Sequence, residues 1–117
     1  MRSFWVYMLA SKPMGTLYIG VTNGLIHRVE QHRDGGASKF TRRYKVQTLV
    51  WFQEFADIRE AIQREKTMKE WARDWKVNLI EQDNPRWQDL YPLLPGVRSI
   101  FRARSKLKDG SRGQAPG

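Results

Sequence analysis

Cysteine is absent from the 117-residue sequence. Disulfide bonds and thiolate metal sites are therefore excluded, and nothing in the composition calls for an oxidising compartment. Histidine is scarce, at two residues, which excludes a metal site built from many imidazoles. The longest apolar run covers residues 4–10 and is far shorter than the ~20 residues that a membrane-spanning helix needs. We therefore expect a cytoplasmic protein with no membrane partner.

Acidic residues are too few to balance the basic ones, and the excess indicates a class of partner. Twelve Asp or Glu stand against 21 Lys or Arg, which gives a formal net charge of +9. Residues 98–117 carry six Lys or Arg and one Asp, so this stretch holds +5 of that charge. Basic residues interleaved with aromatic ones favour nucleic acid over a lipid surface. We predict one domain at residues 1–96 and a flexible, disordered basic tail at residues 97–117.

The first part of the chain predicts a β-hairpin. Residues 3–11 and 15–21 are rich in β-branched and aromatic side chains, and a turn that contains Pro and Gly separates them. If Tyr7 lies opposite Tyr18, the two rings share one face of the sheet. A slip of one residue would place them on opposite faces.

A helix is expected after the hairpin. Asn23 is its expected cap, and Gly35 and Gly36 are expected to end it. Arg28 and His32 lie four residues apart, so they are neighbours on one side of this helix. Taken singly, a surface arginine and a partly buried histidine are ordinary structural residues.

Residues 37–45, with the sequence ASKFTRRYK, are predicted to form a basic loop that binds nucleic acid. Its cations can neutralise phosphates while the ring of Phe40 or Tyr44 stacks on a base. The alternative is a solvated loop that its two aromatic side chains anchor. The candidate nucleic-acid-binding residues are Lys39, Arg42, Arg43, Tyr44 and Lys45.

The most informative residue lies on the second long helix, where Asp57 and Glu60 have capping-box-like spacing at the start. Its predicted apolar face consists of Ile58, Ala61, Ile62, Met68 and Ala72. Glu65 falls on this face, because seven residues after Ile58 the helix has rotated only ~20° from the same direction. A carboxylate there must be paired, protonated or bound to a cation. A salt bridge, for instance with Arg28, and a functional cation site are the two explanations.

The remaining segments complete the fold prediction. Residues 46–55 alternate well enough for a third strand, and residues 71–80 continue the second helix or form another short one. Asn84 and Pro85 predict a capped final turn. The order of elements predicts an α+β fold with a small three-stranded antiparallel sheet flanked by helices.

Taken together, these segments resemble the GIY-YIG endonuclease superfamily, and in particular its small single-domain bacterial members. The resemblance covers residues 4–90. The sequence VY at residues 6–7 matches the end of the first half-motif, and YIG at residues 18–20 matches the second.

The helical motifs extend the resemblance. Arg28 stands ten residues after Tyr18, as the family arginine does, and His32 takes a position where relatives carry His or Tyr. The sequence EAIQREKTMKEW is similar to the helix that supplies the metal-binding glutamate of the family, which falls on Glu65. NPRWQDL, at residues 84–90, is similar to the end segment of the small bacterial branch.

The resemblance implies hydrolysis of DNA phosphodiester bonds with one divalent cation, Mg²⁺ or alternatively Mn²⁺, in DNA repair or processing. It implies that Glu65 binds the cation, that Arg28 holds the phosphate oxygens and that Tyr7 is the candidate general base. Tyr18 and His32 would position water or phosphate. A free phenol titrates near ~10, so Tyr7 needs the cation, Arg28 or a hydrogen bond to lose its proton at neutral pH.

Other functions remain open at this point. Val21, Thr22 and Asn23 stand where some relatives carry a lysine, so a catalytically weak or inactive nucleic-acid-binding module is the main alternative. A protein-interaction domain whose tryptophans face a partner is a third. We expect a monomer that acts on DNA, with RNA not excluded. We also expect selection by shape, such as branches, flaps or single-stranded ends.

Overall fold

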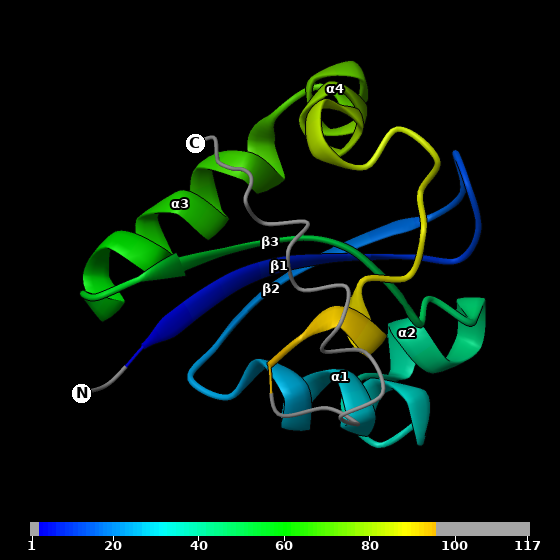
Figure 1. The fold of residues 1–117 in the computed structure, drawn as a ribbon, viewed down its shortest axis with the longest axis horizontal. Helices are drawn as coiled ribbons and strands as arrows, with labels where there is room; N and C mark the ends of the chain where they lie inside the picture. Colours follow the sequence, from blue (N-terminus) through cyan, green and yellow to red (C-terminus); the bar gives the residue numbers. More distant parts are fainter. Residues whose placement is uncertain (1–2, 96–117) are drawn as a thin grey trace.

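The computed structural model describes residues 3–95, in which one antiparallel sheet lies between two layers of helices (Figure 1). The strand order is β2-β1-β3, with strands β1 (Phe4–Ala10), β2 (Leu17–Thr22) and β3 (Thr48–Phe55). One side carries the helices α1 (Leu25–Arg33) and α2 (Lys39–Tyr44). The other side carries α3 (Ile58–Glu70) and α4 (Arg73–Asp83). The predicted α+β fold is confirmed, whereas the predicted tail at residues 97–117 lies outside the described residues.

The hairpin pairs Tyr7 with Gly20 and Leu9 with Tyr18. The register considered for the hairpin, with Tyr7 opposite Tyr18, therefore differs from the observed one by two residues. A shift of two residues keeps a side chain on its face, because side chains alternate along a strand with a period of two. The two phenol rings accordingly share one face, with their centroids 6.3 Å apart.

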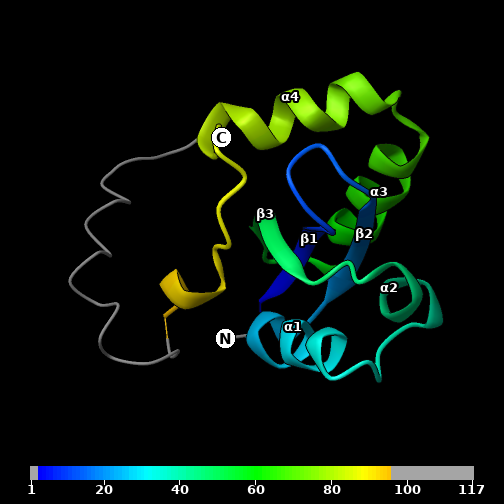
Figure 2. The ribbon, with the colours of Figure 1, turned by 90° about the vertical axis from the view of Figure 1, so that its right-hand side faces the viewer.

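The alternation along β1 sends its side chains into two different cores. Val6, Met8 and Ala10 pack under α3 and α4, while Tyr7 and Leu9 pack against α1. Figure 2 shows these helices on opposite sides of the sheet. An irregularity in the β1–β3 pairing lies between Met8 and Leu9, as expected for a β-bulge, which adds a residue to one strand. The face toward α1 is the one that carries both tyrosines of the predicted site.

The start of α1 differs from the prediction, and its end agrees with it. The predicted cap, Asn23, is exposed, and the N-cap position belongs to Gly24. The Thr22 hydroxyl accepts a hydrogen bond from the Gly24 amide at 3.1 Å, which fixes the turn before the helix, and no side chain in the described part of the chain caps α1 itself. After the helix, Gly35 adopts a φ of +83°, which glycine accommodates without a Cβ clash. The predicted glycine stop is confirmed.

The basic loop predicted at residues 37–45 is wrong in conformation, because most of it forms the short helix α2. The Ser38 hydroxyl accepts from the Thr41 amide, which caps the first turn. At the other end Lys45 takes a left-handed conformation, and the Val46 amide bonds to the Thr41 carbonyl at 2.9 Å. These two caps turn a stretch without readable periodicity into a helix of six residues.

The apolar face predicted for α3 is narrower than expected. Ala61 and Met68 are buried, whereas Ile58 and Ile62 are exposed. Ala72 lies beyond the end of α3, because the backbone is extended there, and it becomes the N-cap position of a separate helix α4. Of the two predicted continuations after residue 70, the second short helix is the correct one.

Asn84 ends one helix and also caps the turn that follows, as predicted, although that turn does not continue into a helix. The Trp87 amide bonds to the Asn84 carbonyl at 3.0 Å, and the Gln88 amide donates to the Asn84 side-chain oxygen at 2.9 Å. Asn84 is the C-cap of α4, and its side-chain amide donates to the carbonyls of Val50 and Gln88 at 3.1 and 2.9 Å. The connection that follows is thereby fixed against β3, and the short helical turn η1 forms only at Tyr91–Leu93. Within residues 3–95, no helix has both the length and the apolar character required to cross a bilayer.

Candidate active site

Tyr7 is the central residue of the site, and Gly20 makes room for it. The Tyr7 side chain is buried on the α1 face of the sheet. A Cβ atom built on Gly20, its cross-strand partner, would lie 2.5 Å from the phenol oxygen of Tyr7. Such a distance is not tolerated, so any other residue at position 20 would displace the phenol. The glycine of the YIG sequence therefore has a steric reason within the hairpin itself.

The Tyr7 hydroxyl belongs to a buried chain of hydrogen bonds that crosses from β1 to α2. It lies 2.9 Å from Nε2 of His32, and Nδ1 of the same ring lies 2.9 Å from the Thr41 hydroxyl. The Thr41 hydroxyl in turn donates to the Ser38 carbonyl at 3.2 Å. His32 and Thr41 are both buried, so neither exchanges these partners for bulk water.

Aromatic rings lead from this buried site to the surface. Tyr18 lies next to His32, with ring centroids 5.1 Å apart, and 6.3 Å from Phe40 on α2. Phe40 then lies 5.0 Å from Tyr44. The side chains of Phe40 and Tyr44 are 42% and 47% exposed. Neighbouring rings therefore connect the buried phenol of Tyr7 with the exposed rings of Phe40 and Tyr44.

The charges of Arg28 and Glu65 both act on the Tyr7 hydroxyl. Burial raises the pKa of Tyr7, Tyr18 and Glu65 raise it further, and Arg28 opposes them. Burial, followed by the positive charge of Arg28, lowers the pKa of His32 to about 4. Both Tyr7 and His32 are consequently neutral near pH 7. A buried phenol in this state holds its proton, so the environment alone does not make Tyr7 a base.

Glu65 reaches this site from the other layer of helices. Its helix α3 packs against β2, the edge strand that carries Tyr18. The side chain is only 14% exposed and forms an ion pair with Lys69, one turn further along α3, at 2.8 Å. The predicted partner Arg28 is therefore wrong. An (i, i+4) pair needs no tertiary approach, which is why Lys69 and not Arg28 meets the carboxylate.

The donor set fits a magnesium-type ion better than a transition metal. Among residues 3–95, no three His, Asp or Glu side chains lie close enough together to hold a metal on their own. Glu65 is thus a single carboxylate in a largely buried position. Mg²⁺ suits such a site, because it retains several waters and takes the remaining ligands from one or two carboxylates and a phosphate.

The predicted nucleic-acid-binding residues lie together on α2 and at its C-cap, and all of them are exposed: Lys39, Arg42, Arg43, Tyr44 and Lys45. The guanidinium of Arg43 lies 5.5 Å from the centroid of the Tyr44 ring. The same helix holds Thr41 on its buried side. One short helix therefore presents cations and rings to solvent and a hydroxyl to His32.

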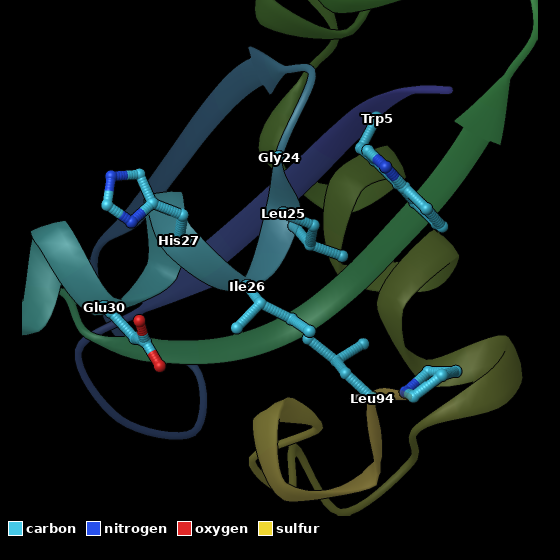
Figure 3. Close-up of a pocket in the computed structure, with 8 residues that line it drawn as sticks. Trp5, Gly24, Leu25, Ile26, His27, Glu30 and Leu94 are labelled. Atoms are coloured by element: carbon cyan, nitrogen blue, oxygen red, sulfur yellow. The ribbon is translucent and has the colours of Figure 1, made fainter. Parts of the chain in front are cut away.

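A separate apolar cavity lies on another side of α1. It has a volume of about 430 Å³, and Figure 3 shows Trp5, Leu25, Ile26 and Leu94 around it. None of Tyr7, Tyr18, His32 or Glu65 lines it. The chemistry-bearing side chains and this cavity are thus two different features of the α1 layer.

Sequence reasoning missed two residues of the hydrogen-bond chain, Ser38 and Thr41. Both lie in the stretch that was predicted as a loop, where hydroxyl side chains have no assigned partner. The available signal was Ser38 itself, since serine favours the position just before a helix. A helix starting there would have turned Thr41 away from the cations beside it.

The fold and this arrangement of side chains define a GIY-YIG domain. The model of the GIY-YIG catalytic domain matches residues 3–78, and the chain belongs to this family. Membership indicates a nuclease. The relatives of this chain include UPF0213 proteins. That of Clostridium perfringens is 40% identical over 65% of this chain and 81% of the relative, and that of Bacillus pumilus is 40% identical over 58% and 69%.

A solved structure is also similar. The solution NMR structure of a UPF0213 protein from Bacillus halodurans has a TM-score of 0.48 and 25% sequence identity. The match covers 82% of this chain and 99% of that one.

Proposed function

We propose that the chain is a divalent-metal-dependent endonuclease that hydrolyses DNA phosphodiester bonds, with selection by DNA structure, in repair or processing. The observation that carries this proposal is the convergence on one hydroxyl. The Tyr7 hydroxyl has a hydrogen-bond partner 2.9 Å away in Nε2 of His32, and it is subject to the charges of both Arg28 and Glu65. A structural tyrosine in a core needs a hydrogen-bond partner for its hydroxyl, but it needs neither of the two charges.

The proton path follows from the hydrogen bonds. Tyr7 removes a proton from the attacking water while its own phenolic proton moves to Nε2 of His32. Imidazole is a poor acceptor while burial and Arg28 hold its pKa at about 4. A substrate phosphate held by Arg28 brings negative charge that offsets the guanidinium, so substrate binding favours the imidazolium.

The two charged residues have complementary roles. Arg28 binds the non-bridging phosphate oxygens and offsets the charge that grows on them in the transition state. Glu65 would hold the divalent cation, Mg²⁺ or Mn²⁺, in place of its ion pair with Lys69. When bound, such a cation supplies polarisation of the phosphoryl group and stabilisation of the leaving oxygen.

DNA would approach over α2. The cations of this helix neutralise backbone phosphates, and the exposed rings of Phe40 and Tyr44 accept bases that are not stacked in a duplex. Such contacts favour branches, flaps and single-stranded ends over uninterrupted duplex. They do not distinguish DNA from RNA, so RNA is a control substrate.

A nucleic-acid-binding module without efficient turnover is the second candidate. The observation that favours it is the ion pair between Glu65 and Lys69, which already neutralises the carboxylate. Residues 21–23 also place no lysine near Tyr7. Binding that persists in chelator, with no cleavage in any divalent cation, would identify this function.

The test compares Glu65→Gln with the wild-type protein on labelled linear, single-stranded and branched DNA, with and without Mg²⁺ or Mn²⁺. We expect cation-dependent cleavage by the wild type and a loss of at least about 10²-fold in Glu65→Gln, because the glutamine carries no charge for the cation. Folding and DNA affinity should be retained.

Glu60→Gln is the matched control, because Glu60 is an exposed acid on the same helix. This variant should cleave like the wild type. Equal cleavage by the Glu65 and Glu60 variants would point to a contaminating nuclease and contradict the assigned role of Glu65. A panel of RNAs in the same assay separates the two nucleic acids.

A further inference from the structure

The buried chain from Tyr7 to Ser38 contains a residue that the proposed mechanism does not use. Thr41 touches neither the phenol nor any position assigned to phosphate, and its side chain is buried against the far nitrogen of His32. Hydroxyls on core helices usually bond to their own helix, as this one does with Ser38. The second contact of the Thr41 hydroxyl, with an imidazole on another helix, is not explained by this common pattern.

The protons of this chain can be counted. A carbonyl only accepts, so in the 3.2 Å contact between Thr41 and Ser38 the hydroxyl proton points to the Ser38 oxygen. The Thr41 oxygen is then left as an acceptor toward His32, so Nδ1 carries the ring proton. Neutral imidazole has one N–H, which leaves Nε2 unprotonated and able to accept from the Tyr7 hydroxyl.

The opposite tautomer satisfies fewer groups. With the proton on Nε2, that nitrogen would donate to Tyr7, and Thr41 would turn its proton from Ser38 to Nδ1. The Tyr7 hydroxyl proton would then have lost its acceptor on His32. Two hydrogen bonds would replace three among the same atoms, all of them in a buried site where an unmade bond is costly.

We infer that Thr41 is a positioning residue that sets the tautomer of His32, so that Nε2 faces Tyr7 as a proton acceptor. Thr41 belongs to α2, the same helix that presents the exposed cations and rings. The helix proposed to bind DNA therefore also orients the imidazole behind the proposed base. The inference rests on the proposed function for its catalytic consequence, while the tautomer itself is measurable without any activity.

The test is the tautomer of His32 read from the ¹⁵N signals of its ring in the full-length protein at neutral pH. Wild type is compared with Thr41→Val, which has nearly the same shape without the hydroxyl, and with Thr41→Ser, which keeps the hydroxyl. We expect protonated Nδ1 and unprotonated Nε2 in the wild type and in Thr41→Ser. In Thr41→Val the proton should move wholly or partly to Nε2, because Nδ1–H would have no partner. The exposed His27 gives a reference signal in every spectrum.

Cleavage of the most reactive DNA then links the tautomer to function. Thr41→Val should cleave at least about 10-fold more slowly, with Thr41→Ser restoring most of the rate, as for other residues that orient an imidazole. Protonated Nε2 in the wild type, or an unchanged tautomer in folded Thr41→Val, would overturn the inference. So would a changed tautomer with unchanged cleavage.

The wild-type spectrum decides the tautomer even if Thr41→Val does not fold. If the wild type cleaves no nucleic acid, the proposed function fails while the tautomer result stands on its own. The two failures are therefore distinguishable.

Discussion

The two faces of the sheet are made from the same strand, and they differ in what they can do. Toward α3 and α4, β1 presents Val6, Met8 and Ala10, which join a core of apolar side chains. Toward α1 it presents Tyr7 and Leu9, so one polar phenol enters the second core. The hydroxyl is tolerated there because it forms a hydrogen bond with Nε2 of His32.

The difference indicates a division of labour within one small domain. Apart from Glu65, the α3 and α4 face contributes mainly stability, because the side chains of its core are buried against one another. The α1 face adds buried polar groups, each of which depends on a specific partner. Truncation of a side chain should therefore cost mainly stability on the first face, and mainly activity or pH response on the second.

The largest expected effect on stability lies on the apolar face. Ile80 of α4 is fully buried in that core, so Ile80→Ala should lower the free energy of unfolding by about 2–5 kcal/mol through lost burial and a residual cavity. Urea denaturation measures this. Ile62→Ala is the matched control, because Ile62 is exposed on α3 and its truncation should change stability by less than about 1 kcal/mol.

The comparison also requires that Ile80→Ala, measured below its own unfolding temperature, keeps the Mg²⁺-dependent activity proposed for the wild type. A variant that stays folded and has lost cleavage would show that the two faces are not independent.

The next effect concerns the pH response of the polar face. The folded-state pKa of His32 is about 4, against an ordinary value of 6.5. Below pH 6.5 the unfolded chain gains a proton that the folded protein rejects, so stability falls as the pH drops from 6.5 toward 4. The slope from this one group is at most about 1.4 kcal/mol per pH unit, and above pH 6.5 its contribution is fully present.

Urea denaturation from about pH 7.5 to about pH 4.5 tests this for wild type, His32→Gln and His27→Gln. The His32 variant should lose part of the decline in stability toward low pH. The His27 variant should retain all of it, because His27 is exposed. Identical pH dependence in all three proteins would show that His32 is not held neutral by the fold.

The sequence predicted those parts of the site that depend on local periodicity. Alternation in two strands placed Tyr7 and Tyr18 on one face even though the assumed register was off by two residues. Helical spacing placed Arg28 and His32 on one side of α1, and the charges at Tyr7 agree with a shared location. In the strands this result survives a register error of two residues but not of one, since a period of two fixes a face without fixing a partner.

The parts that were missed depend on contacts between segments or on short-range competition. Helix α2 has six residues, too few for a periodic pattern, and it forms because of the contacts at its two ends. Thr41 acquires its role only through an imidazole on another helix. Glu65 was predicted to be paired, protonated or bound to a cation. Its partner Lys69 lies four residues further along the same helix, and this local pair forms in place of the one considered with Arg28.

The smallest expected effect compares basic residues on the two sides of the molecule. Arg42 and Arg43 are exposed on α2, beside the proposed path of DNA, whereas Arg59 and Arg86 are exposed on α3 and after α4. Replacing Arg42 and Arg43 by Ala should weaken DNA binding and reduce the slope of log affinity against log salt by about 1–2, since each phosphate contact contributes roughly 0.7–0.9.

The matched control removes the same charge elsewhere, with Arg59→Ala and Arg86→Ala in one protein. Long-range attraction falls equally in both double variants, because the net charge is the same, but only contacts with phosphate release counterions. Fluorescence anisotropy at several salt concentrations separates the two effects. Equal slopes for the two double variants would mean that DNA contacts the domain through its overall charge and not through α2. The proposed roles of the buried residues Tyr7 and His32 would then be unaffected, but α2 would no longer be assigned as the helix that binds DNA.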